Sequence, residues 1–185
     1  MRIGVLALQG AFLEHEQALE KLGVEWTEIR RLADLNGQID GVILPGGEST
    51  VQGKLLVEEG LMLPLREKIR AGLPVFGTCA GMILLAERIV NDESVWLGTS
   101  SVTVRRNAYG RQLGSFRADL QVKGVGNYPA VFIRAPYFED VGRAEALAEV
   151  DDKVVAAREK NMLMTAFHPE LTSDLRVHEY FLKMI

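Results

Sequence analysis

The single cysteine of the chain lies in a pattern typical of a catalytic nucleophile. Cys79 occupies the centre of residues 77–81, Gly-Thr-Cys-Ala-Gly, which follow an apolar strand-like run and precede a helix-like run. A G-x-nucleophile-x-G turn of this kind presents its nucleophile at the edge of a sheet. The start of the following helix favours a thiolate, and the Ala80 N–H would face a developing oxyanion. A lone cysteine is more often inert core filler, but this pattern favours a reactive thiol.

A cysteine that attacks a carbonyl carbon needs a nearby base, and histidine is the usual one. The chain has three histidines, His15, His168 and His178. His168 follows an apolar strand-like run and precedes a proline, with Glu170 two residues further on. In an extended segment residues i and i+2 point the same way, so we expect the Glu170 carboxylate to orient the imidazole. His15 and His178 occur in glutamate-rich helical segments, and we expect both to be solvated.

A glycine-rich turn is a second candidate part of the site. Residues 45–50, Pro-Gly-Gly-Glu-Ser-Thr, follow a short β-branched run and lead into a helix. Two successive glycines allow close approach to a ligand, and the Gly47 N–H is a candidate second oxyanion donor. The alternative is an ordinary turn in which Ser49 or Thr50 caps the helix and Glu48 complements its dipole. The G-x-x-x-x-G-K-[ST] spacing of a phosphate loop is absent from the sequence.

These turns can form one site only if their strands share an edge of a sheet. The first half of the sequence alternates β-branched runs with segments of helical period, which predicts βαβ units and a parallel sheet covered on both faces. We expect strands at residues 3–8, 24–29, 42–44 and 74–77, and helices at residues 12–22, 50–72 and 82–90. Because the carboxyl ends of parallel strands meet at one edge, Gln9, the turn at residues 46–47 and Cys79 should lie together.

The second half of the sequence has a different pattern, with short strand-like runs and few helical segments. Strand-like runs separated by turn signals predict strands at residues 102–105, 118–123, 131–133, 146–150, 154–158 and 162–167. We interpret them as an antiparallel extension with one or two strands returning to the main sheet. Residues 175–184 have apolar side chains at helical spacing and predict a closing helix. The sequence shows no linker, repeat or low-complexity tract, so residues 1–185 are predicted to form one α/β domain.

Composition narrows the class of protein. The chain has 185 residues, of which 48% are hydrophobic, and a formal net charge of -4, which suits a globular protein with a buried core. An acidic balance without a basic cluster argues against nucleic-acid and membrane-surface partners. No signal-peptide pattern or long apolar run occurs, so we expect a cytoplasmic protein. One cysteine excludes an internal disulfide and a multi-cysteine metal site, and we expect no metal or organic cofactor.

With the cysteine elbow, the His-x-Glu pair and the double-glycine turn, the chain resembles the class I glutamine amidotransferases. Further motifs resemble those of one branch, the PdxT family, and the resemblance covers nearly the whole chain. The motifs are residues 4–11 (Gly-Val-Leu-Ala-Leu-Gln-Gly-Ala), 44–50 (Leu-Pro-Gly-Gly-Glu-Ser-Thr), 77–81, 106–112 (Arg-Asn-Ala-Tyr-Gly-Arg-Gln), 132–136 (Phe-Ile-Arg-Ala-Pro) and 167–172 (Phe-His-Pro-Glu-Leu-Thr). The resemblance implies a flavodoxin-like three-layer sandwich, mostly parallel, with helices on both faces and a small antiparallel extension.

The resemblance also implies a reaction and a partner. The PdxT family is the glutaminase subunit of pyridoxal 5'-phosphate synthase, which implies hydrolysis of L-glutamine through a thioester on Cys79, with His168 and Glu170 completing the triad. Ammonia would pass to the synthase subunit, PdxS, a (β/α)8 barrel, in a hetero-oligomer. From its place after the first strand, we expect Gln9 to respond to docking of that partner. The residues implied to contact glutamine are Gly47, Glu48, Ser49, Arg106, Ile133 and Arg134.

The residues by themselves leave two other functions open. A cysteine hydrolase or peptidase could use the same sheet and would cleave peptides while ignoring glutamine. A non-catalytic regulatory subunit could keep the fold without the chemistry, although the complete set of Cys79, His168 and Glu170 argues against it. For Arg106 and Arg134 the alternative to glutamine binding is a solvated strand edge, which composition alone favours.

Overall fold

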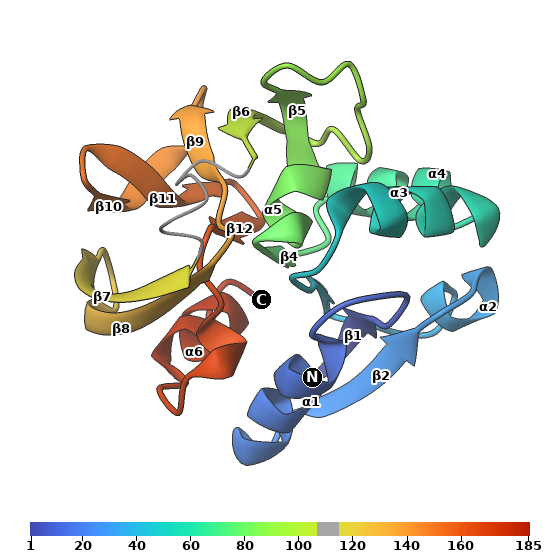
Figure 1. Cartoon of the computed structure of the whole chain (residues 1–185). Coiled ribbons are helices and arrows are strands. Elements are labelled where there is room, and N and C mark those ends of the chain that lie inside the picture. The colour runs from blue at the N-terminus through green and yellow to red at the C-terminus, as the bar shows by residue number, and fades with distance from the viewer. Residues whose placement is uncertain (107–114) are drawn as a thin grey trace.

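A central sheet organises the chain (Figure 1). The computed structural model describes residues 1–106 and 115–185. Among these residues ten strands form one sheet in the order β2-β1-β3-β4-β12-β11-β9-β6-β5, with β10 paired to β11. The first five strands of this order are parallel to one another. They are β2 (Glu25–Ile29), β1 (Arg2–Leu6), β3 (Gly41–Leu44), β4 (Val75–Thr78) and β12 (Met162–Thr165).

Helices cover both faces of the parallel strands. α1 (Phe12–Lys21) and α6 (Arg176–Leu182) lie on one face, and α3 (Ser49–Glu58), α4 (Met62–Arg70) and α5 (Ala80–Leu85) lie on the other (Figure 1). Strand β4 serves both faces because its side chains alternate. The Phe76 ring lies 5.6 Å from the Phe181 ring of α6, whereas a Cβ at Gly77 would come within 2.7 Å of the Gly81 backbone of α5. The expected three-layer α/β class is confirmed.

The remaining strands extend the sheet on one side. β11 (Lys153–Glu159), β9 (Tyr137–Asp140) and β6 (Ser100–Arg105) continue it in antiparallel fashion, and β5 (Ala86–Ile89) joins β6 in parallel. β10 (Glu145–Val150) pairs with β11. This side of the molecule carries the antiparallel extension that the sequence predicted.

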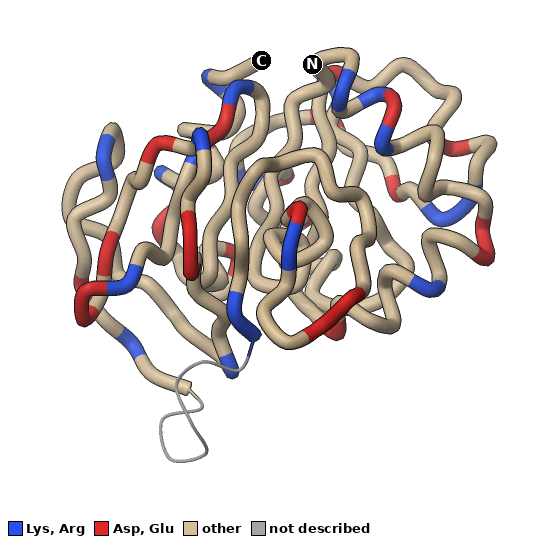
Figure 2. Tube along the Cα trace, turned by 90° about the horizontal axis from the view of Figure 1, so that it is seen from above, with Lys and Arg blue, Asp and Glu red and all other residues tan. Residues whose placement is uncertain are grey.

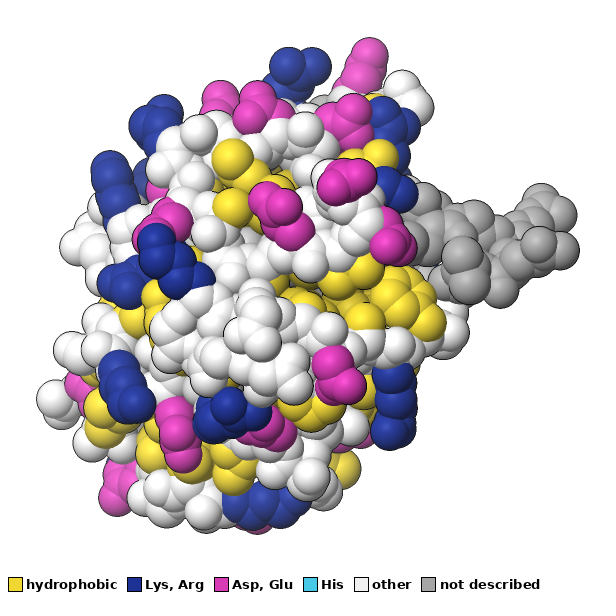
Figure 3. All heavy atoms as spheres, turned by 90° about the vertical axis from the view of Figure 1, so that its left-hand side faces the viewer, with side chains coloured by type: hydrophobic (Ala, Val, Ile, Leu, Met, Phe, Trp, Pro, Cys, Tyr) yellow, Lys and Arg dark blue, Asp and Glu magenta, His cyan; other side chains and the backbone are white. Residues whose placement is uncertain are grey.

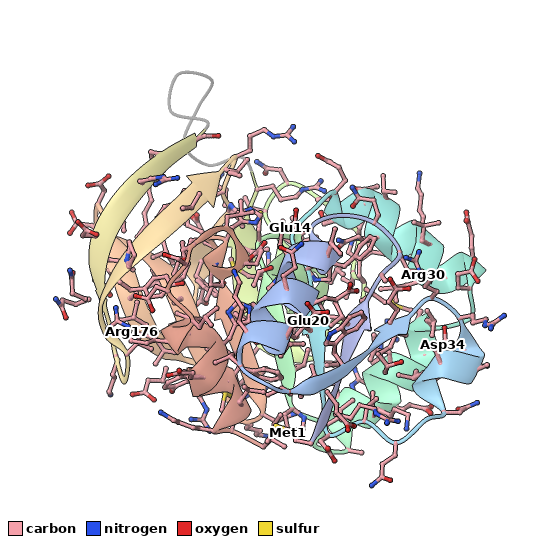
Figure 4. All side chains as sticks on the ribbon, turned by 90° about the horizontal axis from the view of Figure 1, so that it is seen from below. Met1, Glu14, Glu20, Arg30, Asp34 and Arg176 are labelled. Atoms are coloured by element: carbon pink, nitrogen blue, oxygen red, sulfur yellow. The ribbon has the colours of Figure 1, made fainter. Side chains whose placement is uncertain are left out.

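A separate two-stranded hairpin, β7 (Ser115–Val122) and β8 (Gly126–Ile133), lies beside α6. Arg176 at the start of α6 donates to the Val125 carbonyl at 3.1 Å and to the Asn127 carbonyl at 2.7 Å (Figure 4). The face that the hairpin shares with β10 shows acidic and basic side chains around apolar patches (Figure 3). The hairpin is therefore tied to the layer that covers the parallel strands.

Some predicted boundaries were wrong, each for a physical reason. The single helix expected at residues 50–72 is two helices, because Gly60 adopts a left-handed φ of 67° that ends α3. The helix expected at residues 82–90 ends at Leu85, and the segment that follows is strand β5, because pairing with β6 outweighs helical propensity. Strand β9 and the short helix α2 (Leu32–Leu35) were not predicted.

Residues with basic and acidic side chains are interspersed along the chain trace (Figure 2). The two termini lie near each other in Figures 1 and 2. None of the helices in the described part of the chain is long and apolar enough to cross a membrane. Four neighbouring parallel strands, β1, β3, β4 and β12, end at the same edge of the sheet, and Gln9, the Gly46-Gly47 turn, Cys79 and His168 follow these ends.

Candidate active site

Cys79 lies in a strained turn between β4 and α5. Its φ of 47° and ψ of -98° are unusual for a residue with a side chain, and such strain is kept where the surrounding structure enforces it. The Cys79 N–H donates to the Thr165 carbonyl at 2.7 Å. Gly81 allows α5 to lie against β3, because a Cβ there would collide with the Leu44 carbonyl oxygen. The predicted elbow geometry is present, and it leaves Cys79 7% exposed.

A cavity of about 250 Å³ opens at this edge of the sheet. Ile83 is the only lining residue in the described part of the chain that the sequence interpretation missed. It follows Cys79 by four residues on α5, and that helical spacing was the signal that could have found it. The residues that line the cavity are Gln9, Gly47, Glu48, Ser49, Cys79, Ile83, Arg106, Ile133, Arg134 and His168.

His168 and Glu170 are in contact as predicted, although the local backbone differs from the prediction. His168 Nδ1 lies 2.7 Å from Glu170 Oε1, and the His168 N–H donates to the Val131 carbonyl at 2.8 Å. Glu170 belongs to the 3₁₀ turn η1 (Pro169–Leu171) rather than to an extended segment. The tight turn, not the two-residue period of a strand, brings its carboxylate back to the imidazole.

The environment of His168 favours its protonated form. Burial by itself lowers the pKa of His168, but the interactions with the Cys79 thiol and the Glu170 carboxylate outweigh burial and raise the pKa to about 10. Nε2 is buried and has no hydrogen-bond partner among the described residues. The imidazole therefore carries a proton at neutral pH, and His168 lines the cavity together with Cys79.

Hydrogen bonds join the turn after β3 to the turn after β1. The Gln9 side-chain oxygen accepts a hydrogen bond from the Glu48 N–H at 2.9 Å. Gln52 Nε2 donates to the Gln9 carbonyl at 2.8 Å and to the Pro45 carbonyl at 3.1 Å. Gln52 was missed in the sequence, where a polar residue three positions after Ser49 gives little signal. Gln9 therefore contacts the peptide between Gly47 and Glu48. The candidate oxyanion donor, the Gly47 N–H, belongs to the preceding peptide.

Two arginines lie at the cavity, each with an acidic partner. Arg106 Nη1 donates to Thr50 Oγ1 at 3.1 Å, and its guanidinium also pairs with Asp92. Arg134 lies 3.4 Å from the Glu48 carboxylate, and its side chain is 72% exposed. Arg106 is held by two side-chain partners. Arg134 is mostly exposed, as the alternative of a solvated residue at a strand edge predicts.

Of the other predicted site residues, Ser49 and Ile133 line the same cavity, whereas Ala80 is not among its lining residues. Ser49 begins α3 and is buried, and no side-chain hydrogen bond caps that helix, so the capping alternative for Ser49 or Thr50 was wrong. Ile133 ends β8, and buried Ala80 begins α5 directly after the thiol. The rest of the motif that begins at Arg106, residues 107–112, lies outside the described residues.

Comparison with known proteins assigns the chain to a family. Residues 5–185 match the SNO glutamine amidotransferase family. The chain belongs to this family. It is 59% identical over 188 residues to "Pyridoxal 5'-phosphate synthase subunit PdxT" of Carboxydothermus hydrogenoformans, covering 100% of this chain and 98% of the relative. A relative of the same description from Streptococcus pneumoniae strain CGSP14 is 56% identical, with 100% and 97% covered.

A solved structure supports the same assignment. The crystal structure of a glutamine amidotransferase superposes with a TM-score of 0.94 at 48% identity, covering 98% of this chain and 97% of that chain. The resemblance to the PdxT family and the flavodoxin-like amidotransferase fold are therefore confirmed. The match to the SNO glutamine amidotransferase family includes the cysteine elbow, the double-glycine turn and the His-x-Glu pair.

The prediction that His15 and His178 are solvated was wrong. Both side chains are 0% exposed in this SNO family member. His15 Nδ1 lies 2.9 Å from His178 Nε2, and His15 Nε2 lies 3.2 Å from Thr78 Oγ1. Burial lowers the pKa of His178 to about 4, and burial followed by the charges of His178 and His168 lowers the pKa of His15. Both imidazoles are therefore neutral at neutral pH.

The sequence did contain a signal for these two histidines. His15 shares the buried side of α1 with Ala18 and Leu19, three and four residues further on. His178 shares the buried side of α6 with Phe181, three residues further on. Figure 4 shows Glu14 and Glu20 on the same helix α1, and Glu20 is exposed. Weight given to the glutamates, instead of to the helical spacing, led to the wrong prediction.

No group of three or more His, Cys, Asp or Glu side chains among residues 1–106 and 115–185 could hold a metal ion. The chemistry that the described residues offer is that of a thiol, an imidazole and a carboxylate. Those groups suit nucleophilic attack on a carbonyl carbon.

Proposed function

We propose that this SNO family member is the glutaminase subunit of a pyridoxal 5'-phosphate synthase, which hydrolyses L-glutamine to L-glutamate and ammonia. The observation that carries the proposal is the meeting of Cys79 and the His168–Glu170 pair at one cavity that also has charged groups for an amino acid. Family membership and the relatives described as PdxT support the reaction and the pathway.

The first half of the proposed reaction forms a thioester. Once the Cys79 thiol has passed its proton to His168 Nε2, the thiolate attacks the side-chain carbonyl carbon of glutamine, so a C–S bond forms and negative charge moves to the carbonyl oxygen. The N–H groups of Ala80 and Gly47 stabilise that charge. His168 then gives its Nε2 proton to the amide nitrogen, the C–N bond breaks, and ammonia leaves. The raised pKa of His168, about 10, suits this donor role because the proton is present at neutral pH.

The second half hydrolyses the thioester. His168, now neutral, takes a proton from a water molecule as the water oxygen attacks the same carbonyl carbon. The C–S bond breaks, glutamate leaves, and the Cys79–His168 pair is restored. Glu170 accepts the Nδ1–H of His168 throughout, so it holds the imidazole in place and leaves Nε2 for both proton transfers.

Charge complementarity supports a free amino acid as the substrate. Arg106 would bind the α-carboxylate of glutamine, and Glu48 would lie near the α-ammonium group. Both line the cavity with Cys79, and its volume of about 250 Å³ is small beside the ~300–1,000 Å³ of pockets for drug-sized ligands. A peptide substrate would lack one or both of these terminal charges, so the arrangement favours glutaminase over peptidase chemistry.

We further propose that the ammonia passes to a synthase subunit with a (β/α)8 barrel in a hetero-oligomer. The resemblance to the PdxT family supports this partner. The proposed reaction needs Cys79 as a reduced thiol, which suits a reducing compartment, and we propose the cytoplasm. The proposed reaction needs no metal or organic cofactor, since every proton and bond change is supplied by the triad, glutamine and water.

A glutamine analogue with an electrophile in place of the amide tests the proposed function. We expect stoichiometric addition to Cys79 in the complex with the synthase, measured by peptide mass spectrometry, and no addition in Cys79→Ala. Glutamine should protect the wild-type thiol, whereas a glutamine-containing peptide should not. Labelling at another residue, or glutaminase activity retained by Cys79→Ala, would contradict the assignment of the nucleophile.

A further inference from the structure

The three histidines of the chain form one buried series that ends at the candidate nucleophile. His178 Nε2 lies 2.9 Å from His15 Nδ1, and His15 Nε2 lies 3.5 Å from Glu170 Oε2. The other oxygen of Glu170 lies 2.7 Å from His168 Nδ1. His168 in turn lines the cavity with Cys79. The proposed triad thus uses one side of the Glu170 carboxylate, and His15 faces the other side.

The hydrogen-bond donors and acceptors around His15 and His178 favour one tautomer for each of these buried imidazoles. If His178 donates from Nε2 to His15 Nδ1, then His15 carries its proton on Nε2, which faces Thr78 Oγ1 and Glu170 Oε2. The opposite arrangement puts a lone pair of His15 against a carboxylate oxygen. It also puts a proton on His178 Nδ1, which is buried without a partner among the described residues. A buried donor without a partner is the costlier choice, so the first arrangement is favoured.

We propose that His15 is a positioning residue of the active site, whose Nε2–H holds Glu170 Oε2, and that His178 fixes the tautomer of His15. The proposal rests on the proposed function of Cys79, His168 and Glu170. At 3.5 Å the contact with Glu170 is long, and contacts of this kind often shorten when the substrate is bound. Glu170 Oε2 has no hydrogen-bond partner among the described residues, so His15 is the donor available to it.

The surroundings of His15 explain why it acts as a neutral donor. Its neighbours are Thr78 from β4, His178 from α6, and the His168–Glu170 pair from the segment after β12. The Phe76 ring contacts His15 edge-on and excludes water from that side. A neutral N–H can orient the Glu170 carboxylate without competing for its charge, which then remains available to the protonated His168.

Two similar substitutions at His15 separate a positioning role from a packing role. The amide nitrogen of glutamine can take the place of Nε2, whereas that of asparagine reaches only the place of Nδ1. With the synthase present, we expect His15→Gln to keep kcat within about threefold. His15→Asn should lower kcat about 10- to 100-fold with little change in the KM for glutamine, the effect typical of losing a hydrogen bond to a charged group. Equal losses in both variants would overturn the positioning role.

Glu170→Gln provides the second measurement. If His15 acts through Glu170, then adding His15→Asn to Glu170→Gln should lower kcat little further, because the group being positioned is already gone. Losses in kcat that multiply in the double variant would show that His15 acts independently of Glu170, and would contradict the proposal.

Nitrogen NMR of the wild-type chain tests the tautomers without any variant. With ¹⁵N-labelled histidine, His15 and His178 should both be neutral at pH 7 with the proton on Nε2. A proton on His15 Nδ1 would overturn the proposal even if the variants failed to fold. The two proposals can also fail separately. Activity of Cys79→Ala would refute the proposed triad, whereas wild-type kcat in folded His15→Asn would refute only the role of His15.

Discussion

At the scale of single residues, the side chain of Arg106, the proposed carboxylate-binding group, is already held in place by its neighbours. Its guanidinium is held by Thr50 Oγ1 at 3.1 Å and by Asp92. Asp92 is itself fixed, because the Ser94 N–H donates to its carboxylate at 2.8 Å and this bond contributes to a lowered pKa of Asp92. An arginine already oriented loses less side-chain entropy on binding a carboxylate.

Replacement of Arg106 tests that role. We expect Arg106→Ala to raise the KM for glutamine about 10- to 100-fold and to lower kcat much less, because a group remote from the amide binds the ground and transition states equally. Steady-state glutamate release with the synthase present is the measurement. Arg105→Ala is the matched control, since Arg105 pairs with Glu139 at 2.8 Å and is not among the residues lining the cavity. An unchanged KM in Arg106→Ala would support the alternative, that Arg106 is a solvated residue at a strand edge and does not bind glutamine.

At the scale of elements, the turn after β3 and the turn after β12 are packed directly against each other. A Cβ at Gly46 would come within 2.8 Å of His168 Nδ1. Gly46 also accepts a hydrogen bond from the Ala11 N–H at 2.9 Å, which joins the turn after β1 to the same place. The absence of a side chain at Gly46 therefore lets three strand ends converge on one imidazole.

A methyl group at Gly46 should disturb this convergence. We expect Gly46→Ala to lower kcat by ~10²-fold, because a displacement of about 1 Å in a catalytic group has an effect of that size. Gly37→Ala is a suitable control, since a Cβ there meets only the Asp34 carbonyl oxygen at 3.4 Å, at the opposite end of β3. Thermal unfolding of both variants would show whether stability changes. Wild-type kcat in Gly46→Ala would mean that His168 moves aside without loss of function.

At the scale of the whole molecule, the site lies open at one edge of the sheet and depends on Gln9 for the shape of one wall. Gln9 Oε1 holds the Glu48 N–H, so the peptide after Gly47 is tied to a side chain at the cavity. Ammonia released into water near neutral pH becomes ammonium, which has no lone pair for attack on a carbonyl group. A glutaminase that supplies another subunit gains from remaining inactive until that subunit is docked.

We therefore expect the isolated chain to release glutamate slowly and docking on the synthase to raise the rate. If docking turns the Gly47 peptide into the oxyanion site, the increase should be ~10²–10³-fold, the usual effect of one such donor. Gln9→Ala should change that ratio, whereas Gln38→Ala, an exposed residue before the amino end of β3, should not. Glutamate release at saturating glutamine, with and without the synthase, is the measurement. Equal rates in every case would show that the site is preformed.

The sequence by itself determined the parts of the site that are local in the chain. The cysteine elbow, the double-glycine turn and the His168–Glu170 pair are each a few residues long, so the sequence identifies their residues, although the backbone of the last is a 3₁₀ turn where an extended segment was predicted. The alternation of strand and helix periods likewise predicted a parallel sheet whose carboxyl ends share an edge. These features could be predicted because neighbouring residues specify them.

Only the tertiary structure decided the features that join distant segments. β5 became a strand because β6 was available to pair with it, and no residue within the segment signals that partner. His15 and His178 are 163 positions apart, and they meet because α1 and α6 cover the same face of the sheet. Burial against that face, not the glutamates beside them in the sequence, makes these histidines neutral and directs one of them at Glu170.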